Sequence, residues 1–148
     1  MAISFIELKR VEPAGGDVVV PEQGTLVFDT VVSSAGTQIS YDAAAGVITF
    51  NEAGFYYIDW YVAPFFGLTT DGSNWAIQTT LSGLAIIGSS HAKVSVTTGF
   101  AILDVSAGET ARLVNVSDGA ISLSPFVRSK AGLTAYSVAT QTASAVGT

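Results

Sequence analysis

Apolar and β-branched residues gather in short runs along almost the whole chain. Val, Ile, Thr, Phe and Tyr form runs of roughly 5 to 9 residues bounded by Gly, Pro, Asp, Asn or Ser, a pattern typical of β-strands. No segment keeps apolar residues at the helical spacing i, i+3, i+4 and i+7 over three turns. The clearest runs are residues 3–8, 18–20, 26–32, 38–41, 46–50, 54–63, 75–81, 84–87, 94–105, 110–116, 120–126 and 133–139. The pattern predicts an all-β fold with enough strands for two sheets.

The run at residues 54–63, GFYYIDWYVA, has the most clearly two-sided pattern. Neighbouring side chains of a strand point to opposite faces. One face of this strand is wholly apolar and is formed by Tyr56, Ile58, Trp60 and Val62. The other face is mixed and is formed by Phe55, Tyr57, Asp59, Tyr61 and Ala63. We expect the first face in the core of a central strand, and the second against solvent or a neighbouring subunit.

Other runs do not separate cleanly into an apolar and a polar face. In FAILDVS, Phe100, Ile102 and either Leu103 or Val105 compete for the core. In ARLVNVS, Leu113 lies on one face while Val114 shares the other with Arg112. Apolar residues on both faces of a strand favour a second buried surface, such as a subunit interface.

Glycine-containing turns separate the runs. Asp118 and Gly119 in SDGA form the best candidate for a tight hairpin. The segment Pro-Phe-Phe-Gly at residues 64–67 is interpreted as lying outside a strand, which would leave Phe65 and Phe66 in a loop. The small, polar residues 140–148 are expected to form a flexible tail.

Composition bounds the class of protein. A chain of 148 residues fits one domain, spanning residues 1–148, and it contains no cysteine for disulfides or thiolate metal sites. The net charge of −6 disfavours binding to nucleic acid. No run is long and apolar enough to predict a membrane span, and the N-terminus lacks the pattern of a secretory signal. With 49% hydrophobic and 12% charged residues, the chain is either an oligomer or a compact monomer with a Ser- and Thr-rich exterior.

A longer pattern resembles the complement C1q and tumour necrosis factor (TNF) superfamily over about residues 25–140. In chain order, its elements are a tyrosine followed by an acid, a strand preceded by a glycine, a turn that ends in a second glycine, and a long strand rich in aromatic residues. They are carried by Tyr41, Asp42, Gly46, Val47, Ile48, Phe50, Gly54, Tyr56, Tyr57, Trp60 and Val62. The segments LVFDTVV, AILDVSAGETARLVN with its Ala-Gly-acid turn at residues 107–109, and LTAYSVA are similar to further strands of that family.

The variant GFYYIDWYVA looks more like bacterial members, especially the C-terminal domains of BclA-type collagen-like spore-surface glycoproteins. The resemblance implies a two-sheet jelly roll of about ten strands that assembles as a compact homotrimer, usually at the tip of a stalk. It also implies a location on a bacterial spore surface (the exosporium) or cell surface, with a structural or adhesive role.

Candidate chemistry is sparse. A Ser-His-Asp triad would have to use His91, the one histidine, and no nucleophile motif accompanies it, so we expect no catalytic residues and no enzyme activity. No cofactor is expected. Asp71 and Asn74 in TTDGSN are either loop-capping residues or oxygen ligands for calcium, which some C1q relatives hold. Asp59 is expected to face Arg112, Arg128 or Lys130, within one subunit or between two.

The sequence thus favours a non-catalytic, trimerising structural and interaction domain. The candidate interface residues are Phe55, Tyr57, Asp59, Tyr61, Phe65 and Phe66. In the alternative, loops at the distal end of the trimer bind glycans or host surface proteins, and Phe65, Phe66 and Trp75 line a ligand cleft.

Overall fold

A computed structural model describes residues 3–81, 85–91 and 95–140. The regular structure of these residues is entirely β-strand. In chain order the strands are β1 (Phe5–Arg10), β2 (Val18–Val20), β3 (Thr30–Ala35), β4 (Ile39–Asp42), β5 (Val47–Phe50), β6 (Gly54–Val62), β7 (Pro64–Gly67), β8 (Ser73–Thr79), β9 (Ala85–Ser90), β10 (Thr97–Val105), β11 (Glu109–Asn115), β12 (Ile121–Leu123) and β13 (Ala131–Thr140). Of the tail predicted at residues 140–148, Thr140 is the last residue of β13, and residues 141–148 lie outside the described residues.

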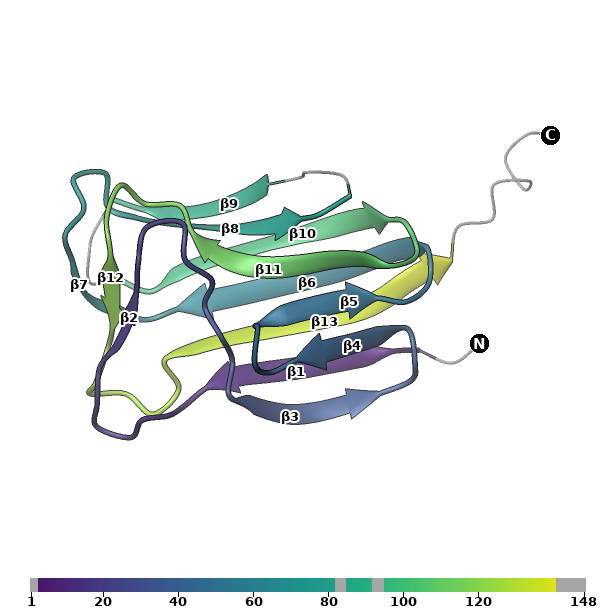
Figure 1. Ribbon diagram of the computed structural model, residues 1–148, viewed down its shortest axis with the longest axis horizontal. Coiled ribbons are helices and arrows are strands. Elements are labelled where there is room, and N and C mark those ends of the chain that lie inside the picture. The colour runs from purple at the N-terminus through teal and green to yellow at the C-terminus, as the bar shows by residue number, and fades with distance from the viewer. Residues whose placement is uncertain (1–2, 82–84, 92–94, 141–148) are drawn as a thin grey trace.

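The strands form two five-stranded antiparallel sheets and one small sheet. The first sheet has the order β10-β6-β13-β1-β3, the second β4-β5-β11-β8-β9, and the third β2-β12-β7. In Figure 1 the small sheet closes the left end of the molecule, whereas β1 begins and β13 ends at the right. The two large sheets confirm the predicted all-β jelly roll of about ten strands. Within the described residues, no helix is long and apolar enough to cross a membrane.

The core fills the space between the two large sheets. As predicted, the apolar face of β6 lies in it, and Tyr56, Ile58, Trp60 and Val62 are all buried. The second sheet contributes Trp75, Ile77 and Leu113 among others. The competition predicted in β10 is resolved in favour of Leu103 and Val105, which are buried, while Phe100 and Ile102 point outward.

The strand predicted at residues 26–32 is only partly correct, because β3 begins at Thr30. The Tyr41 hydroxyl satisfies the backbone of Phe28 in place of a strand partner. It accepts a hydrogen bond from the Phe28 N–H and donates one to the Phe28 carbonyl, both at 2.8 Å. Burial is the first cause that raises the pKa of Tyr41, so its hydroxyl keeps the proton that it donates.

Tyr41→Phe is expected to destabilise the fold by about 2 kcal/mol, because it leaves an N–H and a carbonyl beside a buried Phe28 without partners. Urea unfolding followed by tryptophan fluorescence measures the change. Tyr136→Phe is the matched control, since Tyr136 lies at the surface. Equal stability of Tyr41→Phe and the wild type would show that water replaces the hydroxyl without cost.

The interpretation of residues 64–67 as lying outside a strand is wrong. They form β7 at the edge of the small sheet and pair with β12, with Gly67 opposite Ile121 and Pro64 opposite Leu123. Proline has no N–H to donate, so it is tolerated at the first residue of an edge strand. The proline therefore starts this strand.

The hairpin predicted at Asp118 and Gly119 is also wrong, since β11 and β12 belong to different sheets. The buried Asn115 side chain donates hydrogen bonds to the carbonyls of Val20 and Gly119, each at 3.0 Å, and so directs the chain from one sheet to the other. A Cβ on Gly119 would lie 2.5 Å from the Leu68 carbonyl oxygen. Glycine is therefore required here by close approach of another segment.

Candidate assembly face

The outer face of the first sheet carries the mixed side of β6. Tyr57, Asp59 and Tyr61 are half-buried there and Phe55 is more exposed, so four of the six predicted interface residues lie together on one strand. Their part in a subunit interface stays a prediction.

The strand register places a row of apolar side chains across this face. Ile102 lies opposite Tyr57, Tyr57 opposite Tyr136, and Tyr136 opposite Phe5. The rings of Tyr57 and Tyr136 are 5.0 Å apart, and Ile102 is 64% exposed. We call Phe5, Tyr57, Ile102 and Tyr136 the apolar row. Phe5 and Tyr57 are half-buried, whereas Ile102 and Tyr136 are exposed. A contiguous apolar surface marks an interaction site more often than scattered single residues do.

Phe100 extends the apolar row on β10 and is 71% exposed. The sequence pattern did not assign Phe100, Ile102 or Tyr136 to this face. The signal was present, because residues two apart in β10 share a face. Both faces of β10 are apolar, however, so alternation alone did not reveal which one is buried.

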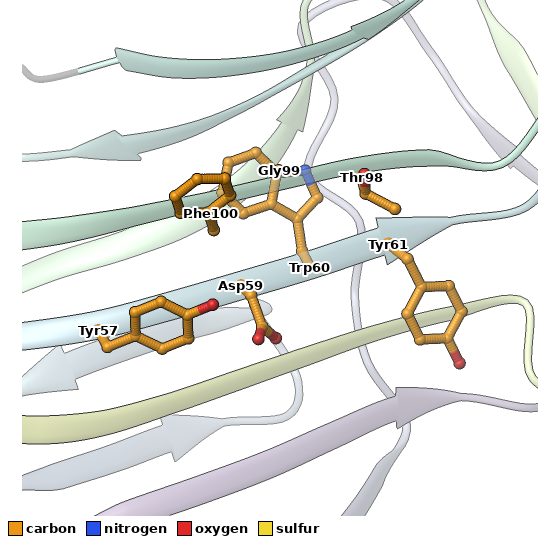
Figure 2. A pocket seen from close by; sticks show the side chains of 7 residues that line it. All are labelled: Tyr57, Asp59, Trp60, Tyr61, Thr98, Gly99 and Phe100. Atoms are coloured by element: carbon orange, nitrogen blue, oxygen red, sulfur yellow. The ribbon is translucent and has the colours of Figure 1, made fainter.

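A pocket of about 330 Å³ opens on the same face beside Asp59. Its lining residues come from β6 and β10 and are Tyr57, Asp59, Trp60, Tyr61, Thr98, Gly99 and Phe100. Figure 2 shows the Tyr57 hydroxyl pointing toward the Asp59 carboxylate, with Phe100 standing on the neighbouring strand. We call this the Asp59 pocket. It combines one carboxylate with aromatic walls, which is a suitable environment for a cation.

The pKa of Tyr57 is raised, first by loss of hydration and then by the charge of Asp59 and the hydrogen bond to its carboxylate. The phenol therefore stays protonated and can donate to the carboxylate at neutral pH. The Asp59 carboxylate is the acceptor that the pocket presents, and the Tyr57 phenol is one of its donors.

Aromatic side chains of β6 cover glycines on both neighbouring strands. Trp60 is paired with Gly99, where a Cβ would lie 2.1 Å from the indole ring. Tyr61 is paired with Gly132, where a Cβ would lie 2.4 Å from the phenol ring. In each case the ring covers backbone that a glycine leaves bare. The Trp60 indole N–H has no hydrogen-bond partner within the described structure.

Contacts of Tyr61 fix the edge of the face nearest the small sheet. Lys9 Nζ lies 3.3 Å from the Tyr61 hydroxyl oxygen and 4.8 Å from the ring centre. The same hydroxyl is hydrogen-bonded to the Ser129 hydroxyl. The loop that joins β12 to β13 is thereby held against the outer face.

The structure does not support two of the partners predicted for Asp59 within one chain. Lys130 is buried and its Nζ donates to the carbonyls of Ser124 and Val127, at 2.8 and 3.4 Å. Arg112 lies on β11 in the second sheet. These positions remove Lys130 and Arg112 as partners of Asp59 within one chain and leave Arg128, which is exposed. Pairing between subunits stays a prediction.

Phe65 and Phe66 lie apart from the other four predicted interface residues. They are on β7 in the small sheet, and both are exposed. The Phe65 ring packs edge-on against Phe126 with ring centres 5.1 Å apart. Trp75, expected beside them in the alternative ligand cleft, is instead fully buried in the core.

The candidate calcium ligands Asp71 and Asn74 take part in hydrogen bonds between loops. The Asn74 amide donates to the Asp71 carbonyl at 3.2 Å, and the Asp71 carboxylate accepts from the Asp118 N–H at 3.2 Å. In return the Asp118 carboxylate accepts from the Thr70 N–H at 2.7 Å and from the Thr70 hydroxyl. Among the described residues, no group of three or more His, Asp or Glu side chains is placed to hold a metal ion.

Hydrogen bonds from the Thr70 hydroxyl and N–H lower the pKa of Asp118 to about 2. A carboxylate with a lowered pKa stabilises the folded state above its ordinary pKa of 3.8, and this contribution is lost as the pH falls toward about 2. Asp118→Asn is therefore expected to lower the Tm at pH 6, and the difference from the wild type is expected to vanish near pH 2. Asp17→Asn is the control for the change in charge. A difference in Tm that is the same at both pH values would contradict this assignment.

His91, the single candidate for catalysis, is exposed directly after β9.

No protein-family model and no curated protein sequence matches the chain. Solved structures do match it. The globular domain of the zebrafish complement 1qA protein aligns with a TM-score of 0.65 and 14% identity, over 93% of this chain and 99% of that one.

Murine APRIL aligns with a TM-score of 0.64 and 14% identity, over 93% of this chain and 100% of that one. The Eiger TNF of S. frugiperda aligns with a TM-score of 0.62 and 13% identity, over 96% of each chain. These similarities show that the fold is the C1q and TNF type of jelly roll.

Proposed function

We propose that this protein is a non-catalytic structural domain that assembles into a homotrimer through the outer face of its first sheet. The observation that carries the proposal is the apolar row, which crosses four neighbouring strands and leaves Ile102 and Tyr136 exposed and Phe5 and Tyr57 half-buried in the single chain. Burying apolar surface stabilises association by roughly 25 cal/mol per Å² before the costs of association are counted. The resemblance to C1q and TNF domains favours three copies.

In such a trimer the domain acts as a clamp on attached segments. The first residues of β1 lie at the end of the molecule away from the small sheet (Figure 1). Segments joined ahead of β1 in three copies would therefore leave the trimer side by side. A collagen-like stalk on a bacterial spore or cell surface is the setting that the resemblance to BclA-type domains favours, and the clamp would hold its three chains in register.

A fusion protein tests the clamp. A short run of Gly-Pro-Pro triplets placed ahead of residue 1 is expected to form a triple helix whose melting temperature is higher than that of the free peptide and independent of concentration. Circular dichroism measures the melting. The same fusion on the Ile102→Arg variant is the control. Equal melting temperatures for the free peptide and the wild-type fusion would contradict the proposal.

The small sheet favours a second function as a binding surface for glycans or host proteins. Val19 and Phe66 lie on either side of Ser122 in register, and both are exposed at the end away from the start of β1. A glycan array probed with wild type and Phe66→Ser tests this function. Saturable binding that the variant loses supports it, whereas no saturable binding by the wild type contradicts glycan recognition.

A further inference from the structure

We infer that the Asp59 pocket is completed by the Arg128 side chain of a neighbouring copy, so that each subunit interface contains one Arg128–Asp59 ion pair against aromatic walls. This inference rests on the proposed trimer. It assigns the residue that each copy contributes to the pocket of the next.

The first step is the state of Asp59 in an assembled protein. Its carboxylate is half-buried on the outer face, and it is flanked there by Phe100 on β10 and Thr134 on β13. When another copy covers this face, the carboxylate loses much of its remaining water. A charge removed from water is costly unless a charged or hydrogen-bonding partner replaces the water. Tyr57 supplies one hydrogen bond but no positive charge, so a cation from the covering copy is the partner that best replaces the lost water.

The second step identifies which basic side chains can supply that cation. Lys9 is held by Tyr61 of its own chain. Arg10 donates to two carbonyls of its own chain, from Nε to Glu12 at 2.7 Å and from Nη1 to Val27 at 3.0 Å. Lys130 is buried in its own loop.

Two of the basic side chains in the described part of the chain remain without a bond to their own chain, and both are exposed. Arg112 lies on β11 of the second sheet, opposite Gln78 and next to the buried Leu113, so it points away from the core on the far side of the sandwich. Arg128 lies in the loop between β12 and β13. The next residue of that loop, Ser129, is bonded to Tyr61, which lines the pocket.

The third step is position along the strands. Tyr61 and Asp59 are two residues apart on β6, or about 7 Å along the strand. Rotation about a three-fold axis parallel to the strands leaves every residue at its original height. If the axis of the proposed trimer has this direction, Arg128 of one copy lies within an extended side chain's reach of the height of Asp59 in the next, because Ser129 is bonded to Tyr61. The aromatic walls of the pocket also favour a guanidinium group, which is planar and stacks on rings.

Neutral polar variants test the pair. Asp59→Asn and Arg128→Gln are each expected to raise the concentration at half-assembly by about tenfold, as expected for the loss of one desolvated ion pair. The double variant is expected to be no weaker than either single variant, because both remove the same interaction. Arg112→Gln is the matched control with the same loss of charge, and it should assemble like the wild type. Mass photometry over a dilution series measures assembly.

Three outcomes would overturn the inference. A trimeric wild type with an unchanged Arg128→Gln variant would show that Arg128 is not the partner, while the proposed trimer stands. If the rise in the concentration at half-assembly of the double variant equals the product of the two single-variant rises, the two residues act separately. A monomeric wild type would remove the proposed function together with this inference. Circular dichroism of each variant separates loss of assembly from loss of fold. A charge swap is a further test: the double variant Asp59→Arg with Arg128→Glu is expected to assemble better than Asp59→Arg alone.

Discussion

Ile102→Arg is expected to leave a folded protein that no longer assembles. Ile102 lies at the end of the apolar row and is 64% exposed in the single chain, so its replacement hardly affects the core. In the trimer, each copy would lose an isoleucine side chain worth about 1.5–3 kcal/mol and would have to bury an arginine instead. The concentration at half-assembly is therefore expected to rise by about 100-fold or more.

Ile87→Arg is the matched control for this prediction. Ile87 is similarly exposed, at 60%, but it lies on β9 of the second sheet, opposite Ala76. The same substitution there is expected to leave assembly unchanged. Sedimentation velocity over a dilution series compares the two variants. If both variants assemble like the wild type, or if only Ile87→Arg dissociates, the outer face of the first sheet is not the interface.

Gly99→Ala is expected to destabilise the fold by about 3 kcal/mol. The added Cβ would lie 2.1 Å from the Trp60 ring, and Trp60 is buried in the core and cannot move aside. Alanine elsewhere in a strand is stabilising relative to glycine by about 0.5–1 kcal/mol, so the expected sign is the reverse of the intrinsic preference. Chemical denaturation measures the change.

Gly132→Ala provides the comparison. Its Cβ would lie 2.4 Å from the Tyr61 ring, but Tyr61 is only half-buried and its ring can turn outward. We expect a smaller loss of stability there, and a weaker assembly if Tyr61 then leaves the edge of the face. A Gly99→Ala variant as stable as the wild type would show that the Trp60 ring can pack against a residue with a side chain at position 99.

The sequence predicted β6 and its two faces correctly because alternation in this strand is unambiguous. Tyr56, Ile58, Trp60 and Val62 are buried, and Asp59 marks the opposite face. The same rule did not assign Phe100 and Ile102, because β10 is apolar on both sides and only the packing of the two sheets decides which side is covered.

Contacts between distant segments account for the other errors. Residues 26–29 have the composition of a strand, yet the hydroxyl of Tyr41 replaces a strand partner for Phe28. Gly119 follows an aspartate as in a tight hairpin, yet it is needed because Leu68 approaches it closely. Neither contact leaves a local signal in the sequence, since the residues involved are far apart along the chain.

The native mass of the wild type tests the central proposal most directly. Light scattering at micromolar concentration is expected to give three times the mass of the 15.2 kDa chain. The same mass is expected for Ile87→Arg, and the mass of one chain for Ile102→Arg. A wild-type mass corresponding to one chain, or to two, would contradict a trimer formed through the outer face of the first sheet.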